Sequence, residues 1–325
     1  MTTYRNVQGY RVKSLNSDPD NPKEGQVWYN NISKSLKGRY SFSDTWSSGG
    51  NMNTGRATGG GAGTQTAALF YGGQYPGPAS TGLTEEYDGS SWTESGDMNQ
   101  ARVYLGATGS QTAGLAAGGR NTGPPGPESS NVEEYNGSSW SNVTALPVAT
   151  YLPRMAGPQT AAIGAGGYRG YYPGASIDAT ILYDGTNWTT GGNLNNIGQW
   201  GGAVGTQTAM MVAGLYPTNG QTEEYNGSSW SNANPMGSGR YFIGTFGTQT
   251  SAVFAGGGPG SFSNTERYDG TNWSSTTPLT VGRRLSEGGV LSPSEAGITM
   301  GGIGDSDATE EFTGAFSASE PFDVS

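Results

Sequence analysis

Short runs of apolar residues recur along this chain, separated by segments rich in Gly, Ser, Thr and Asn. Ala67-Ala68-Leu69-Phe70-Tyr71 is one such run, and Ser251-Ala252-Val253-Phe254-Ala255 is another. Most runs follow a Gln-Thr pair and end in Gly-Gly. Apolar runs of this length, bounded by turn residues, predict strands, since helices need roughly ten residues or more. We therefore expect an all-β protein.

A second pattern places a Trp five residues after a Tyr. Its first copy is Thr84-Glu85-Glu86-Tyr87-Asp88-Gly89-Ser90-Ser91-Trp92. Later copies occupy residues 132–140, 183–188, 222–230, 265–273 and, in a faded form, 309–316. Asp-Gly or Asn-Gly between strand-forming residues is a strong signal for a two-residue type I′ hairpin turn. We predict a β-hairpin in each copy, with an aromatic residue on each side of the turn.

The aromatic residue that ends each copy returns every 42 to 48 residues. These residues are Trp46, Trp92, Trp140, Trp188, Trp230, Trp273 and Phe316. An Arg follows four of the Trp by 10 residues and Trp140 by 14, whereas the fourth repeat offers Gln199. The Arg residues are Arg56, Arg102, Arg154, Arg240 and Arg283. One repeat thus contains a Gly-rich strand, an apolar strand closed by Gly-Gly, a variable loop, a Tyr strand and a Trp strand. Four strands in about 45 residues predict one blade of a β-propeller.

This order of strands, with Gly-Gly closing an apolar strand and a Tyr preceding a Trp, resembles the kelch family over residues 47–316. The short Gly/Thr/Ser-rich strands and the Gln-Thr opening depart from that family. Residues 19–46 carry Gly25-Gln26-Val27-Trp28-Tyr29-Asn30, then Leu36-Lys37 and Trp46. This progression resembles a short module of phage tail and virion-fibre proteins. The two resemblances together are closest to kelch-like repeats of marine-phage structural proteins, which implies a propeller fold and a location in the virion.

The repeats suggest an extended lead-in over residues 1–24 and a propeller over residues 25–325. Residues 25–46 would supply three strands of a partial first blade, and residues 47–316 would supply six kelch-like repeats. Residues 317–325 would add a closing strand, with Glu320-Pro321-Phe322-Asp323-Val324-Ser325 as its innermost strand. Joining the two ends of the chain in one sheet would remove an exposed edge. We therefore expect seven blades of four strands, with six blades plus a separate N-terminal hairpin as the alternative.

Composition narrows the function classes. Hydrophobic residues make up 33% of the 325 residues, which predicts a thin core repeated between sheets. The formal charge of −10 argues against nucleic acid as a partner. The chain has no Cys and no His, so it lacks the commonest general base and the soft-metal ligands. We therefore expect no enzyme activity, no metal and no cofactor. We also expect no membrane insertion, because no run approaches the roughly 18 apolar residues of a membrane span.

The Glu-Glu pairs of the Tyr strands invite an acid/base interpretation. They are Glu85 and Glu86, Glu133 and Glu134, Glu223 and Glu224, and Glu310 and Glu311. Adjacent residues of a strand face opposite sides of the sheet, so the two carboxylates of a pair cannot converge on one substrate. We expect structural pairing with the periodic Arg residues of neighbouring units. The alternative for the Arg series is a ring of guanidinium groups that binds an anion at one mouth of the central channel.

The loops after Gly-Gly vary while the rest of each repeat does not, and loops carry recognition on rigid scaffolds. The candidate ligand or partner residues in these loops are Tyr75, Arg120, Tyr168, Arg169, Tyr171, Tyr172, Tyr216 and Phe262. Exposed aromatics there would stack on sugars or pack against neighbouring subunits. We expect a non-enzymatic phage virion protein, a tail or fibre component or a head decoration. Its partners would be other virion proteins or a host-surface glycan. The sequence does not decide whether the protein also forms a homo-oligomer. The alternative is a soluble carbohydrate-binding or scaffolding kelch module of cellular origin.

Overall fold

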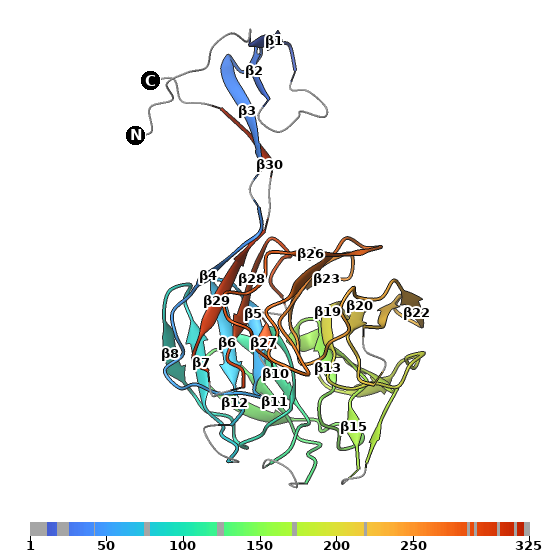
Figure 1. Ribbon diagram of the computed structural model, residues 1–325. Coiled ribbons are helices and arrows are strands. Elements are labelled where there is room, and N and C mark those ends of the chain that lie inside the picture. Colours follow the sequence, from blue (N-terminus) through green and yellow to red (C-terminus); the bar gives the residue numbers. More distant parts are fainter. Residues whose placement is uncertain are drawn as a thin grey trace. The chain divides into compact units, whose positions relative to one another are not determined.

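A computed structural model describes residues 12–17, 26–41, 43–74, 79–121, 127–170, 174–217, 220–284, 287–288, 291–303, 306–314 and 317–321. The chain divides into two compact units. The first unit is Met1–Asp44 together with Gly314–Ser325, and the second is Thr45–Thr313. The second unit contains, in its described part, six four-stranded sheets, which we number as blades 1 to 6 (Figure 1).

Blades 1 to 3 follow one another along the chain. Blade 1 consists of β5 (Gly60–Thr64), β6 (Ala67–Tyr71), β7 (Thr84–Tyr87) and β8 (Trp92–Ser95). Blade 2 consists of β9 (Gly106–Ser110), β10 (Ala113–Ala117), β11 (Val132–Tyr135) and β12 (Trp140–Val143). Blade 3 consists of β13 (Arg154–Ala156), β14 (Ile163–Ala165), β17 (Thr180–Tyr183) and β18 (Trp188–Thr190), with a 3-10 turn at Gln159–Ala161. A small ribbon of β15 (Tyr168–Arg169) and β16 (Ala175–Ser176) extends its loop.

Blades 4 and 5 repeat the same order, and blade 6 closes the series. Blade 4 consists of β19 (Gly202–Thr206), β20 (Ala209–Ala213), β21 (Thr222–Tyr225) and β22 (Trp230–Ala233). Blade 5 consists of β23 (Gly244–Thr248), β24 (Ser251–Ala255), β25 (Thr265–Tyr268) and β26 (Trp273–Thr276). Blade 6 consists of β27 (Glu287–Gly288), β28 (Ala296–Met300), β29 (Thr309–Thr313) and β4 (Thr45–Ser48).

The blades form a closed ring through their first strands. β5 contacts β9, β9 contacts β13, β13 contacts β19 and β19 contacts β23. β23 contacts β27, and β27 returns to β5. Within each blade the strand order is the predicted one, from the Gly-rich strand at the centre to the Trp strand outside. The prediction of an all-β propeller of four-stranded blades is confirmed.

Blade 6 is closed by the strand that carries Trp46, against our expectation. We placed Trp46 with Trp28 and Tyr29 in a first blade, but β4 pairs with β29 of the last repeat, with Trp46 opposite Phe312 (Figure 1). The Trp46 indole also donates a hydrogen bond to the Thr277 carbonyl at 3.1 Å. In the described part of the chain, the last repeat adds no fourth strand of its own after β29, and Phe316 lies outside the described residues. The N-terminal Trp strand fills that vacant outer position, so the two ends of the propeller are joined in one sheet.

The first unit contains a separate four-stranded sheet in the order β1-β2-β3-β30. Its strands are β1 (Lys13–Leu15), β2 (Val27–Asn30), β3 (Ser35–Ser41) and β30 (Ser317–Pro321). Residues 13–15 were expected to be irregular, yet they pair in parallel with β2. A closing strand was expected over residues 317–325, in the innermost position beside β2, yet residues 317–321 pair with β3, and residues 322–325 lie outside the described part of the chain. This arrangement matches six blades plus a separate N-terminal element better than the preferred seven-bladed ring.

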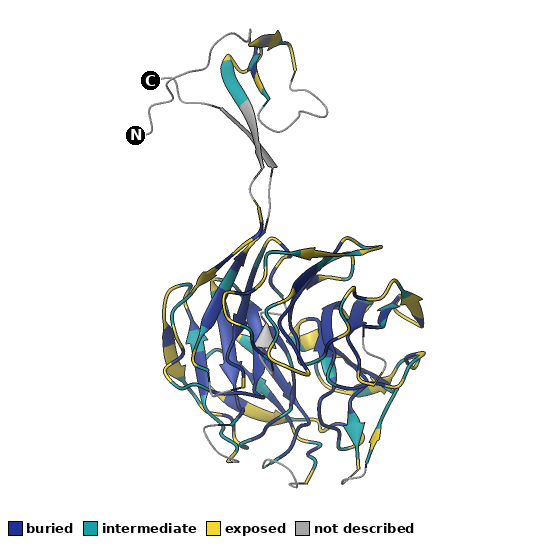
Figure 2. Ribbon diagram, viewed as in Figure 1, coloured by how far each residue is buried: buried dark blue, intermediate teal, exposed yellow. Residues whose placement is uncertain are grey.

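The core of the second unit consists of thin apolar layers between blades, as the low hydrophobic content predicted. Six buried clusters are formed, each by residues of two adjacent blades. Between blades 1 and 2, for example, Leu69 and Tyr71 pack with Leu105 and Trp140. Figure 2 shows the buried residues concentrated in the inner strands, while the outer strands and turns are exposed. Burial between sheets thus substitutes for one large apolar centre.

Polar side chains fasten each blade to the one before it. The Gln of the Gln-Thr pair reaches back to two carbonyls of the preceding blade, as Gln111 Nε2 does at 3.1 Å to Ala68 and 2.6 Å to Tyr87. Gln159, Gln207 and Gln249 make the same pair of bonds. This contact explains why the Gln-Thr opening recurs in five of the six repeats: buried carbonyl groups at the blade interface need a donor.

The hairpin between the Tyr and Trp strands forms as predicted, but its turn is wider. Tyr87 pairs directly with Trp92, so four residues connect the strands and the turn is not a two-residue type I′ turn. The Asp88 carboxylate accepts hydrogen bonds from the backbone N–H groups of Ser90 and Ser91, each at 2.8 Å. Gly89 takes a positive φ of 91°. The side chain of Asp88 therefore shapes the turn, as Asp and Asn do in Asx turns.

Candidate functional site

One end of the second unit gathers the irregular parts of the repeats. There each blade contributes the loop after its Gly-Gly pair and the segment before its innermost strand. A backbone bridge joins the two segments in blades 1 to 5. The bridged residues are Ala57 with Gln74, Val103 with Arg120, Tyr151 with Tyr168, Gln199 with Tyr216, and Tyr241 with Gly258. We call this end of the second unit the Gly-Gly face.

A strained residue occupies the same position of the Gly-Gly face in five blades. Non-Gly residues there have φ between 53° and 65°, in the left-handed region: Thr58, Tyr104, Leu152, Trp200 and Phe242. Backbone hydrogen bonds link several of them from blade to blade, such as Tyr104 N–H to the Thr58 carbonyl at 2.8 Å. A left-handed non-Gly residue costs about 1–2 kcal/mol. Because this chain places Gly at most other positive-φ positions, the retained side chains point to a role of their own.

Aromatic side chains collect on the Gly-Gly face over blades 4 and 5. The Trp200 ring centroid lies 4.9 Å from those of Tyr216 and Phe242, with interplanar angles of 31° and 30°. Tyr241 lies edge-on to Tyr216 at 5.5 Å and to Phe242 at 5.2 Å. Tyr216 is 38% exposed, and the other three rings are partly exposed. We call these four residues the aromatic row. Three of them were missed from the sequence.

Blades 2 and 3 carry a more polar cluster on the same face. The Arg120 guanidinium lies 3.8 Å from the ring centroid of Tyr151 and 3.9 Å from the Glu128 carboxylate. Tyr168 packs on Tyr151 with centroids 5.0 Å apart. Burial raises the pKa of Tyr151 to about 12. Burial also raises the pKa of Tyr104, although nearby Arg120 opposes the shift. These contacts hold Arg120 inside the face, beside an acidic partner of the same loop.

The predicted loop residues differ in their exposure to solvent. Tyr216 is exposed, Tyr168 is partly exposed, and Arg169 donates to the Thr150 hydroxyl at 3.0 Å. Arg120 is buried, and Phe262 is partly buried. Tyr75, Tyr171 and Tyr172 lie outside the described residues. The structure thus brings Tyr168 and Arg120 together around Tyr151, but it places Tyr216 in the separate aromatic row.

The residues that the sequence analysis missed all come from the segment before the innermost strand. These residues lie 11 or 12 positions after the Trp of the preceding repeat: Tyr104, Tyr151, Trp200, Tyr241 and Phe242. That segment was treated only as the location of the periodic Arg. The signal that could have revealed these residues is an aromatic residue directly after the periodic Arg, as in Arg240-Tyr241-Phe242.

Four of the five periodic Arg residues lie inside their blades. Arg102 is fully buried and donates to the Glu133 carboxylate at 2.9 Å and to the carbonyls of Gly118 and Asn131. Burial lowers the pKa of Arg102, and the charge of Glu133 opposes that shift. Arg56, Arg240 and Arg283 form the same ion pair with Glu85, Glu266 and Glu310. The pairing is within one blade, not with a neighbouring unit as expected. These guanidinium groups anchor the loops of the Gly-Gly face.

Arg154 departs from this series. Its blade has Thr150 at the usual Arg position and Ile181 at the usual Glu position, so both partners of the ion pair are replaced together. Arg154 instead lies on β13, opposite Ala165. Residues at the same register in the other blades are Gly60, Gly106, Gly202, Gly244 and Glu287.

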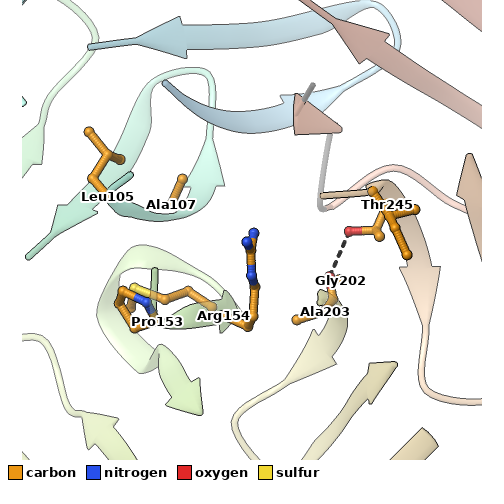
Figure 3. Close-up of a pocket in the computed structure, with 9 residues that line it drawn as sticks. Leu105, Ala107, Pro153, Arg154, Gly202, Ala203 and Thr245 are labelled. Carbon is orange, nitrogen blue, oxygen red and sulfur yellow. Dashed lines mark hydrogen bonds between the residues drawn. The ribbon is translucent and has the colours of Figure 1, made fainter. Parts of the chain in front are cut away.

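A small cavity lies between the innermost strands of blades 2 to 5, with Arg154 beside it (Figure 3). Its walls include Ala107, Gly202 and Thr245, and the Thr245 hydroxyl donates to the Ala203 carbonyl at 2.9 Å. Arg154 is the charged member of this lining. Leu105 and Met155 of this lining also pack against glycines of neighbouring innermost strands, Gly60 and Gly106.

The Glu-Glu pairs are used up in structural contacts. Glu85 faces Arg56 in its own blade and also accepts the Asn53 N–H at 2.7 Å. The second Glu accepts a hydrogen bond from the Tyr hydroxyl of the next blade, as Glu134 does from Tyr183 at 2.9 Å. The same bond links Tyr87 to Glu311 and Tyr268 to Glu224. The two carboxylates of a pair point to opposite sides of the sheet, as strand alternation predicted.

Comparisons with known proteins supply no family for this chain: no family model matches it, and the search of curated proteins finds no relative. Among the described residues, no group of His, Cys, Asp and Glu is arranged to hold a metal ion, and no helix is long and apolar enough to cross a membrane. The propeller of repeated four-stranded sheets is established by the structure. The resemblance to kelch repeats and to phage proteins stays a prediction.

Proposed function

We propose that this protein is a non-enzymatic structural component of a virus particle, a tail, fibre or head-decoration subunit built on a kelch-like propeller. Its Gly-Gly face is the surface that it presents to the host surface or to other subunits. The resemblance of residues 19–46 to the phage tail module and of residues 47–316 to kelch-like repeats supports the location in the virion.

The main observation behind the proposal is that the side chains that differ from blade to blade gather on one face of a repeated scaffold. The aromatic row, the Arg120 cluster and the strained positions all lie on the Gly-Gly face. The opposite end repeats the same Asp or Asn turn in five blades. A scaffold that varies at one face only is typical of a recognition protein, because the variable residues are free of the constraints of the repeat.

The use of the acidic residues supports a non-catalytic role. A general acid or base needs a carboxyl group that can reach a substrate. Here the first Glu of each pair is engaged by a buried Arg or by backbone N–H groups, and Glu223, whose blade lacks that Arg, is held by Asn195 and Asn196. The carboxylates of the Tyr strands therefore serve the blades themselves.

Proteomic analysis of purified particles tests the proposal. Virus particles would be isolated on a density gradient from a culture that carries this coding sequence, and their proteins would be identified by mass spectrometry. We expect this protein to co-purify with the major capsid protein at a constant ratio across the particle peak. Recovery only in the soluble host fraction would contradict the virion role and favour a cellular binding module.

A further inference from the structure

We propose that the aromatic row, formed by Trp200, Tyr216, Tyr241 and Phe242, is a binding site for a neutral carbohydrate. The inference names the ligand class of the Gly-Gly face, and it rests on the recognition role proposed above. It concerns residues of blades 4 and 5 alone, so the Arg120 cluster of blades 2 and 3 serves as an internal comparison.

The aromatic row is held rigidly by the backbone. Tyr216 exchanges two hydrogen bonds with Gln199, at 2.8 and 3.2 Å, which places its ring beside that of Trp200. The N–H of Phe242 donates to the Trp200 carbonyl at 2.6 Å, so blade 5 is tied to blade 4 at this point. A rigid aromatic surface binds a ligand without the entropic cost of ordering its side chains.

Positive φ angles of 65° and 59° mark Trp200 and Phe242, at positions where Gly would be relaxed. In blades 1 and 3 the same position holds Thr58 and Leu152, which are buried and pack within the unit. Tyr104 of blade 2 is partly exposed, as Trp200 and Phe242 are, but its ring centroid lies 6.4 Å from that of Tyr151, whereas Trp200 lies 4.9 Å from both Phe242 and Tyr216. Two strained, partly exposed rings that belong to one aromatic row point to ligand contact.

The chemistry of the aromatic row fits an uncharged sugar. The ring faces carry negative electrostatic potential and attract the weakly positive C–H faces of a pyranose, while the Tyr216 and Tyr241 hydroxyls can exchange hydrogen bonds with sugar hydroxyls. The four side chains carry no charge. The nearby Arg284 donates to the Pro259 carbonyl at 2.8 Å, and the chain has a net charge of −10, which disfavours polyanionic glycans.

The test uses the full chain and a printed array of neutral oligosaccharides, namely glucans, mannans, galactans and N-acetylglucosamine oligomers, beside sialylated and sulfated glycans. The best neutral oligosaccharide is then titrated calorimetrically against the wild type and three variants. Trp200→Gly removes the ring and relaxes the backbone, and Tyr216→Ala removes the most exposed ring. Tyr104→Gly makes the same backbone change as Trp200→Gly but on blade 2.

We expect Trp200→Gly and Tyr216→Ala to weaken binding by about tenfold or more, as truncation of a central aromatic contact does, and Tyr104→Gly to bind like the wild type. A melting temperature close to that of the wild type shows that each variant is folded. Binding to anionic glycans only, no binding to any neutral oligosaccharide, or equal losses in all three variants would overturn the inference. Such a result leaves the virion proposal intact if the protein is found in particles, so the two failures are distinguishable.

Discussion

The two ends of the propeller unit are built from the same strands but obey different rules. At the turn end, every described Tyr–Trp hairpin of blades 1 to 5 uses an Asp or Asn whose side chain accepts two backbone N–H groups, and the sequences are nearly interchangeable. At the Gly-Gly face, neighbouring blades present Arg120, Tyr168 or Tyr216 at one and the same bridged position. The turn end is conserved between repeats by local backbone geometry, whereas the Gly-Gly face keeps only its backbone and lets its side chains vary.

Buried Arg–Glu ion pairs lie below the variable loops of the Gly-Gly face and hold their backbone. Arg102 and its counterparts donate to the carbonyls that carry the Gly-Gly loops, and each is neutralised by a Glu of the same blade. Blade 3 replaces both partners, since Thr150 and Ile181 stand where Arg and Glu stand in blade 2, whereas blade 4 keeps Glu223 and holds it with Asn195 and Asn196. A buried Glu below the face is thus kept only where the chain supplies a polar partner for it.

The largest change in stability is expected from breaking one of these buried ion pairs. Glu133→Ile leaves the fully buried Arg102 without its counterion, and we expect a loss of about 3–5 kcal/mol in the free energy of unfolding. The double variant Arg102→Thr with Glu133→Ile copies blade 3 and should recover most of the loss. Urea unfolding followed by Trp fluorescence measures both. Glu94→Gln on the exposed face of β8 is the control, and a double variant less stable than the single one would refute the blade 3 analogy.

A second prediction concerns the Tyr–Glu links between blades. Tyr87 donates to Glu311 at 2.6 Å and accepts the Gly50 N–H at 3.2 Å, so Tyr87→Phe should cost about 1–2 kcal/mol. Tyr225 faces Leu182 of the preceding blade at the equivalent place, so Tyr225→Phe is the matched control. Blade 6 already carries Phe312, where Arg267 of blade 5 replaces the Glu and lies 5.9 Å from the ring. Equal losses in the two variants would show that the hydroxyl–carboxylate bond contributes nothing.

The same link predicts a pH dependence. Burial, reinforced by the bond to Glu311, raises the pKa of Tyr87 from 10.0 to about 12. The folded state therefore favours the protonated phenol, so the stabilisation is complete below pH 10 and is lost as the pH rises from about 10 to 12. Unfolding midpoints measured between these pH values should fall more steeply for the wild type than for Tyr87→Phe. Parallel curves would assign the alkaline loss to other groups.

The positive-φ residues of the Gly-Gly face predict a smaller change, and this one is a gain in stability. Thr58 has φ 62°, and its hydroxyl makes no hydrogen bond within the described part of the chain. Thr58→Gly should stabilise the unit by up to about 1 kcal/mol, because strain relief exceeds the added entropy of the unfolded chain. Thr58→Ala keeps the strain and should show no such gain. Destabilisation by Gly would mean that packing of the Thr methyl group outweighs the strain.

The comparison of the two ends also explains what could be predicted from the sequence. Strand order and blade content follow from local signals such as Gly-Gly after an apolar run, and these were predicted correctly. The partner of Trp46 was not, because every Trp strand is nearly equivalent and the repeat alone cannot say which blade the first one completes. The fate of the Glu pairs was predictable from strand alternation, but the choice of Arg partner within the blade depends on packing around Arg102.

The site was harder to predict than the fold. Tyr216 was found because it follows the end of an apolar strand, but its neighbours Trp200, Tyr241 and Phe242 lie 16 to 26 residues away from it in the chain. Only the backbone bridge between Gln199 and Tyr216 and the contact between adjacent blades bring these rings together. Periodicity marks which positions vary, whereas the meeting of two variable segments depends on the three-dimensional ring.

The smallest effect is expected at the turn end. Backbone hydrogen bonds, chiefly from Ser91, hold the pKa of Asp88 at about 2, below its ordinary 3.8, so the ionised form stabilises the turn above pH 3.8 and the contribution is lost as the pH falls towards 2. Asp88→Asn keeps the acceptor oxygen, as Asn136 does with bonds of 3.0 Å to Ser138 and Ser139. Its melting temperature at pH 7 should match the wild type, and its acid limb between pH 4 and 2 should be flatter. The reciprocal Asn136→Asp should gain the acid dependence that Asp88→Asn loses. A large change at pH 7 in either variant would mean that the turn end is less interchangeable than its repeats indicate, and the contrast with the Gly-Gly face would weaken accordingly.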